Sequence, residues 1–184
     1  MRKTWIAALI GAALSGSLAA APTQWAGNGH FYEFIPGQFT WQQAFDAAQA
    51  TSFNGQQGYL ATVTSGAENG FLSTSISREI GWLGGSDDGA EGNWTWRDGP
   101  EAGQAFTYTN WNPGEPNDCC TGEDFLHLNF AIVGGWNDHG GPGNPNQLNG
   151  YFIEFNGQRT VPEPGSLALL AAGLMALSLR RRRG

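Results

Sequence analysis

The stretch from Trp111 to Asp138 constrains this chain more than any other part of it. It opens with Trp-Asn-Pro-Gly-Glu-Pro-Asn-Asp-Cys-Cys-Thr-Gly-Glu-Asp-Phe, continues into an apolar run and ends with Gly-Gly-Trp-Asn-Asp. Side-chain oxygen donors crowd the stretch, and it contains neither Lys nor Arg to neutralise them. These donors include Glu115, Asn117, Asp118, Glu123, Asp124, Asn137 and Asp138. Because clustered carboxylates repel one another, the stretch predicts a bound cation.

The residue types favour calcium over zinc. Calcium takes about 6–8 oxygen ligands in flexible geometry, which suits Asp, Glu and Asn on loops, whereas zinc favours Cys and His. The Glu115–Pro116 bond is predicted to be cis, since X-Pro bonds adopt this form readily and a cis bond turns the flanking side chains to one side.

The order Glu-Pro-Asn, Gly-Glu-Asp, Trp-Asn-Asp resembles the long-loop region of C-type lectin-like domains, specifically the mannose-type version that binds sugar. The likeness runs from about Gly29 to Phe155. It implies an α+β fold in which two short helices flank antiparallel sheets and a long loop region binds calcium. It also implies calcium-dependent carbohydrate binding and no enzyme activity.

The resemblance assigns ligands residue by residue. A principal calcium would be held by Glu115, Asn117, Glu123, Asn137 and Asp138, with a further backbone oxygen from Asp138. The same five residues would bind sugar, because two vicinal hydroxyls replace waters on the ion. In the family, Glu-Pro-Asn accompanies equatorial 3- and 4-hydroxyls, as in mannose, glucose and N-acetylglucosamine. An auxiliary calcium would be held by Asp87, Glu91, Asp118 and Asp124, although acidic loop residues can also simply be solvated.

Both ends of the chain are typical of sorting signals. Residues 1–21 have a basic start, an apolar core and small residues before the expected cleavage, as in a secretory signal peptide. Residues 161–184 contain Pro-Glu-Pro, a short apolar transmembrane segment and four Arg, and they resemble the PEP-CTERM signal of Gram-negative bacteria. This resemblance implies an exosortase as a processing partner, transient anchoring in the inner membrane and delivery to the cell surface or beyond; a plain membrane anchor is the alternative. Residues 22–160 form the lectin-like domain.

The net charge of the chain limits the classes of ligand that it can bind. Between Ala20 and Val161 the chain has 15 Asp or Glu, three Arg and no Lys, a net charge of −12. This balance disfavours nucleic acid and favours a neutral glycan, such as the producer's own exopolysaccharide.

Cysteine use departs from the family. Phe125 and Phe155 stand in the regions where Cys is usual, so both family disulfides are missing, and packing and calcium must supply more of the stability. The adjacent Cys119 and Cys120 allow either a vicinal disulfide or an intermolecular one that links a dimer.

Local patterns predict the elements. Capping boxes at Thr40 and Ser65 open two helices. Gly81 to Gly85 matches the central strand of the family, and four further segments are strand-like: 29–35, 59–63, 125–130 and 149–155. The tryptophans are assigned mainly to the core. The 140–149 loop is longer than the family usually has, and it is either an inert insertion or part of a secondary sugar subsite.

Three functions remain open on the sequence. The first is a calcium-dependent lectin. The second is a calcium-stabilised scaffold of the same fold that binds a protein or matrix partner, since fold alone does not determine function. The third, a glycosidase, is disfavoured because nearly all carboxylates are accounted for as metal ligands.

Overall fold

The computed structural model describes residues 21–120, 122–142 and 145–157. The predicted PEP-CTERM segment and, apart from Ala21, the predicted signal peptide lie outside these residues. Within the described ranges, no helix is long and apolar enough to cross a membrane.

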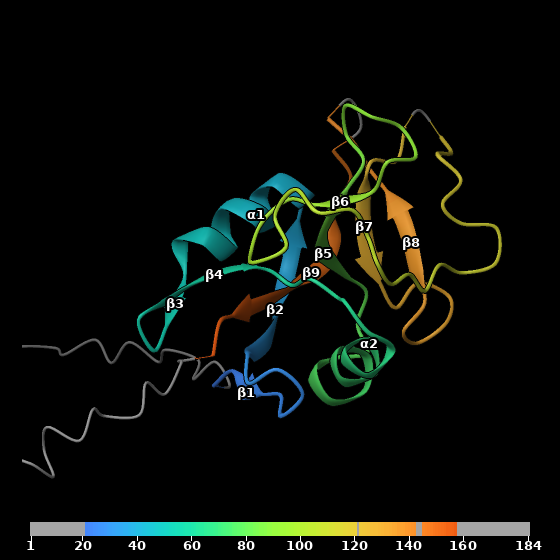
Figure 1. The fold of residues 1–184 in the computed structure, drawn as a ribbon. Coiled ribbons are helices and arrows are strands. Elements are labelled where there is room, and N and C mark those ends of the chain that lie inside the picture. Colours follow the sequence, from blue (N-terminus) through green and yellow to red (C-terminus); the bar gives the residue numbers. More distant parts are fainter. Residues whose placement is uncertain (1–20, 121, 143–144, 158–184) are drawn as a thin grey trace, which may run out of the picture.

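The fold is α+β, as predicted (Figure 1). The sheet has the strand order β1-β2-β9-β5-β7-β8, with β4 pairing β9, β3 pairing β4 and β6 pairing β5. All pairings are antiparallel except the short parallel contact between β5 and β9. The strands are β1 (Thr23–Gln24), β2 (Phe31–Phe39), β3 (Ser52–Phe53), β4 (Gln56–Leu60), β5 (Gly81–Ser86), β6 (Thr95–Trp96), β7 (Phe125–Leu128), β8 (Trp136–His139) and β9 (Leu148–Phe155).

The two helices lie apart, with strands between them (Figure 1). In α1 (Trp41–Ala50) the predicted capping box is present: the Gln43 N–H donates to Thr40 Oγ1 at 3.2 Å and the Thr40 N–H donates to Gln43 Oε1 at 3.0 Å. In α2 (Gly66–Phe71), which continues into the π-helix η1 (Leu72–Ile76), only Ser65 caps the backbone. The second capping box is therefore wrong in its reciprocal half, because Glu68 Oε2 accepts from the Thr64 N–H and Oε1 accepts from the buried Tyr32 hydroxyl.

The core forms two clusters that share the central strands. Along β5, Trp82 packs into one cluster and Leu83 into the other, as the two-residue period of a strand requires. Trp82, Trp96 and Trp136 are almost completely buried, which confirms their assignment to the core. The indole N–H groups of Trp41 and Trp82 donate to the Leu83 and Phe39 carbonyls. This packing gives β7 and β8 a rigid base.

Gly84 in β5 supports a first prediction. A Cβ atom at Gly84 would lie 2.6 Å from the Leu60 carbonyl oxygen, a backbone atom that cannot rotate away. We expect Gly84→Ala to lower the free energy of unfolding by about 2 kcal/mol, as overpacked cores do. The control is Gly70→Ala in α2, where no atom lies within 4 Å. This change should raise stability by about 0.5–1 kcal/mol because alanine favours a helix. Urea unfolding measures the free energy of unfolding of both variants. Equal losses of stability in the two variants would contradict the predicted clash at Gly84.

Candidate metal centre

The five residues of the predicted principal site come from the loop after Trp111, the segment before β7, and β8. β8 pairs with β7 so that Asp138 lies opposite Leu126. Asp138 Oδ2 accepts from the backbone N–H groups of Asn117 at 3.0 Å and Asp118 at 2.8 Å, which fastens the loop to the strand. The Glu115–Pro116 bond is cis, as predicted.

Unsatisfied carboxylate oxygens mark this region. Glu115 Oε2 and Asp138 Oδ1 are buried and have no hydrogen-bond donor among the described residues. Burial, the charge of Asp138 and the charge of Glu123 raise the pKa of Glu115. A buried acceptor without a donor is costly, and a cation bound beside such an oxygen would offset that cost. The donor set, all oxygen, therefore fits calcium.

Two histidines hold members of the predicted set in place. The Asn137 amide contacts the Asp138 carbonyl oxygen, and its Nδ2 lies 3.1 Å from His127 Nε2. Burial lowers the pKa of His127 to about 3, so the ring is neutral and Nε2 can accept. His139 Nδ1 lies 3.0 Å from Glu123 Oε1. Neither supporting contact was predicted from the sequence, because the first depends on the β7–β8 register, which sets His127 opposite Asn137.

Three of the four predicted auxiliary residues converge. Asp87, Glu91 and Asp124 each offer one carboxylate oxygen within 4.8 Å of the others, and no other such group of three or more acidic, His or Cys side chains is found in the described chain. Burial raises the pKa of Asp87 to about 6, and the charges of Glu91 and Asp124 add to the shift. Asp118 lies outside this trio, and its Oδ1 accepts from the Glu123 N–H at 2.9 Å.

The two cysteines are joined to each other by a disulfide. The predicted dimer linked through Cys119 or Cys120 is therefore wrong, because both sulfurs are consumed within one loop and no free thiol remains. The bond lies within one loop of one chain, in which Cys120 adopts a φ of 62°, in the left-handed region.

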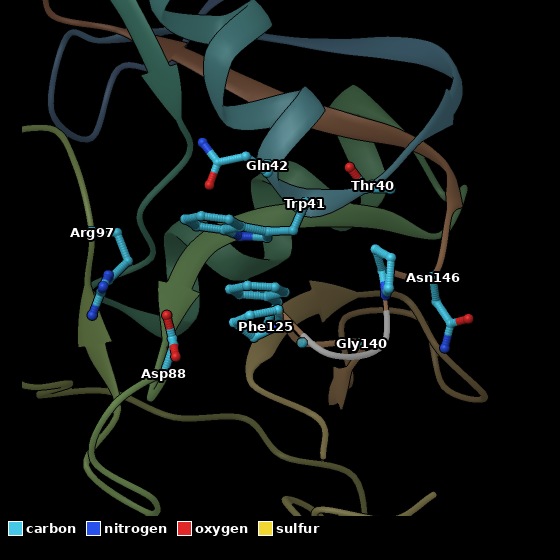
Figure 2. Close-up of a pocket in the computed structure, with 11 residues that line it drawn as sticks. Thr40, Trp41, Gln42, Asp88, Arg97, Phe125, Gly140 and Asn146 are labelled. Atoms are coloured by element: carbon cyan, nitrogen blue, oxygen red, sulfur yellow. The ribbon is translucent and has the colours of Figure 1, made fainter. Parts of the chain in front are cut away.

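A cavity of about 340 Å³ is lined by Asp88 and Phe125, the residues that follow Asp87 and Asp124 of the auxiliary trio in the chain (Figure 2). Trp41 stacks on Phe125 in its wall, with ring centroids 4.5 Å apart and planes 5° apart. Asp88, Arg97 and part of the 140–149 loop complete the lining. Gly141 lies close to the Asp124 carboxylate, with which a Cβ at this position would overlap. The loop thus packs against the trio, whereas none of the five principal residues lines the cavity.

Comparison with known families decides the identity. The family model of the lectin C-type domain matches residues 38–131. The chain belongs to the C-type lectin domain family. Members of this family are generally binding domains without catalysis, and they typically bind calcium. The model of the PEP-CTERM protein-sorting motif matches residues 160–183 of the same chain, which confirms that part of the tail prediction.

Relatives and solved structures agree with this C-type lectin assignment. Halomucin of Haloquadratum walsbyi is 35% identical over 142 residues, covering 72% of this chain and 2% of halomucin. The mouse low affinity immunoglobulin epsilon Fc receptor is also 35% identical, over 140 residues, covering 74% of this chain and 38% of the receptor. The chain thus spans well under half of each of these relatives.

Two solved lectin structures have the same fold. The cow C-type carbohydrate-recognition domain of CD23, solved in the presence of GlcNAc2Man3 oligosaccharide, superposes with a TM-score of 0.54 at 29% identity, covering 68% of this chain and 86% of that one. The C-type lectin CEL-I from Cucumaria echinata gives a TM-score of 0.59 at 26% identity, covering 75% and 99%.

The raised pKa of Asp87 predicts how pH acts on this lectin domain. Without calcium, the folded form keeps a proton on Asp87 up to a pH of about 6, while the unfolded chain loses it near 3.8. Asp87 therefore lowers the stability of the calcium-free fold as pH rises through this window. Calcium requires the deprotonated carboxylate, so its stabilising effect should grow over the same range.

Thermal unfolding at pH 5 and pH 7.5, with and without calcium, measures this dependence. The calcium-induced rise in melting temperature should be larger at pH 7.5, and Asp87→Asn should flatten the difference. A rise of equal size at both pH values in the unsubstituted protein would contradict a calcium at Asp87.

Proposed function

We propose that this chain is a calcium-dependent lectin whose principal ion is held by Glu115, Asn117, Glu123, Asn137 and Asp138. The observation that carries the proposal is a pair of buried, donor-free oxygens, one on Glu115 in the ligand loop and one on Asp138 in β8, the strand to which this loop is tied. The bound ion would polarise and orient two vicinal sugar hydroxyls. Around it, carboxylates accept from these hydroxyls, and the amide N–H groups of Asn117 are available to donate to them.

The proposed sugars are mannose, glucose and N-acetylglucosamine. The Glu-Pro-Asn order supports equatorial 3- and 4-hydroxyls, and the cow CD23 domain was solved in the presence of an oligosaccharide built from mannose and N-acetylglucosamine. A neutral glycan also suits a domain with 15 acidic residues and three Arg between its two ends.

A second ion is proposed at Asp87, Glu91 and Asp124, with Asp118 as a fourth ligand after a change in its side chain. Asp87 Oδ1 is buried without a donor among the described residues, and desolvation together with the charges of Asp118, Asp124 and Asp138 raises the pKa of Glu91. Both observations support a cation at this place, because a positive charge removes the repulsion among the carboxylates.

The sorting motif sets the cellular place of this lectin. The PEP-CTERM match at residues 160–183 indicates export and sorting to the cell surface in Gram-negative bacteria, with processing by an exosortase. To this we add three proposals: removal of a signal peptide at residues 1–21, transient anchoring of the precursor in the inner membrane, and an exposed lectin domain at 22–160. Its glycan would belong to an exopolysaccharide or biofilm matrix.

Affinity chromatography tests the function. The protein should be retained on immobilised mannose in calcium and should elute with chelator. Free glucose and free N-acetylglucosamine should also displace it from the column, whereas galactose should not. Retention that survives the chelator would overturn the role of the ion. If calcium raises the melting temperature but no neutral glycan binds, the alternative gains: a calcium-stabilised scaffold with a protein or matrix partner.

A further inference from the structure

An open groove of 460 Å³ borders the Glu-Pro-Asn loop at Pro116, the residue between two of the proposed calcium ligands. The rings of Trp94, Phe106 and Trp111 line it. Its other lining residues include Asn93 and Thr109, which are exposed. The groove is separate from the cavity in Figure 2, with which it shares no lining residue.

The aromatic lining is held in place before any ligand arrives. Trp94 and Trp111 meet edge to face at 4.9 Å, and Trp111 in turn packs edge to face on the buried Trp136 at 5.7 Å. The backbone of the next residue, Asn112, donates its N–H to the Trp136 carbonyl at 2.9 Å. Trp111 is nevertheless only partly buried, so it presents ring surface to the groove. A pre-formed surface binds with little loss of conformational entropy.

Polar groups are available beside these rings. Neither the Asn93 amide nor the Thr109 hydroxyl has a side-chain hydrogen bond within the described part of the chain. The indole N–H of Trp94 is buried and lacks an acceptor among the described residues. Because this N–H is buried, the exposed side chains of Asn93 and Thr109 are the polar groups that a ligand in the groove can reach.

The chemistry of the groove favours a neutral ligand. No Asp, Glu, Lys, Arg or His lines it, whereas the cavity in Figure 2 carries both Asp88 and Arg97. Aromatic surface with a few amide and hydroxyl groups suits a ligand that has apolar C–H faces and neutral hydroxyls. A sugar ring has both.

We infer that this groove is a second subsite, which binds the saccharide next to the one on the principal calcium. The inference rests on the proposed function. Because the groove adjoins the Glu-Pro-Asn loop, one oligosaccharide can contact both the principal calcium and the groove. The ligand is then a neutral oligosaccharide of at least two residues. The calcium provides the hydroxyl contacts at one residue, and the aromatic rings contact the face of the next.

Calorimetric titration of the full chain in calcium tests the subsite. The probes are the methyl glycosides of mannose, glucose and N-acetylglucosamine, each compared with its trisaccharide: mannotriose, cellotriose and chitotriose. For at least one pair, the trisaccharide should bind about tenfold more tightly than the methyl glycoside, the effect of one modest added contact. Thr109→Trp, which fills the groove, should remove this preference and leave the methyl glycoside affinity within about twofold.

The matched control is Thr107→Trp, which places the same side chain on an exposed residue of the same segment that does not line the groove. It should keep the preference, and Asn93→Ala, a milder change, should reduce it. Binding of methyl glycosides with no trisaccharide preference in the unsubstituted chain would overturn the subsite and leave the calcium site standing. No calcium-dependent binding of any probe would overturn the proposed function, and the subsite with it.

Discussion

Asp138→Asn is expected to lower calcium affinity at the principal site by about 100-fold and to abolish retention on mannose, since it removes a charged ligand from the ion. Asp138 is fully buried, and one of its oxygens accepts from two backbone N–H groups of the ligand loop. Asparagine retains an oxygen that can accept both, so the loop should stay attached to β8. Calorimetric titration with calcium, then with methyl mannoside, measures the two losses.

The control for this substitution is Asp46→Asn. Asp46 is exposed on α1, where its side chain accepts a hydrogen bond from the Gln42 amide, so the same chemical change should leave calcium and sugar affinity unaltered. Unchanged calcium affinity in Asp138→Asn would remove Asp138 from the ligand set. Retained calcium affinity with loss of sugar would instead assign Asp138 to sugar contact alone.

Calcium itself is expected to raise the melting temperature by roughly 8 °C. An ion present at about 100 times its dissociation constant stabilises the folded state by about 2.7 kcal/mol, and a domain of this size gains about 2–4 °C for each kcal/mol. The effect should be prominent because the described chain has one disulfide, and this closes a loop of adjacent residues only. Such a short closure restrains the unfolded chain very little.

Scanning calorimetry with calcium, with chelator and with calcium restored measures the shift. Magnesium serves as the control ion, because it demands a smaller and more regular shell of ligands and should stabilise less. Comparing Asp138→Asn with Asp87→Asn divides the shift between the two proposed ions. A melting temperature unmoved by calcium would contradict both sites together.

The acidic loops carry an electrostatic cost that the proposed ions would relieve. Asp87 Oδ1, Glu115 Oε2 and Asp138 Oδ1 are buried without donors among the described residues, and the pKa values of Asp87 and Glu115 are raised, chiefly by burial. A fold with these features carries a cost that only protonation or a cation relieves. The same residues therefore couple stability, pH and the proposed sugar binding.

Local features of this protein followed from the sequence by itself. The cap at Thr40, the β5 strand, the cis bond at Pro116 and the burial of Trp82 were all predicted correctly, because each depends on neighbouring residues or on hydrophobic period. The motif order also identified the family and the sorting tail, since both are properties of residue order.

Tertiary structure decided what depends on residues far apart in the chain. It paired His127 with Asn137, turned Glu68 away from its expected cap toward Tyr32, and joined the trio of Asp87, Glu91 and Asp124 without Asp118. It also assembled the groove from the segments around Trp94 and Trp111. Strand register and side-chain packing set these distances, and neither is encoded in a short stretch of sequence.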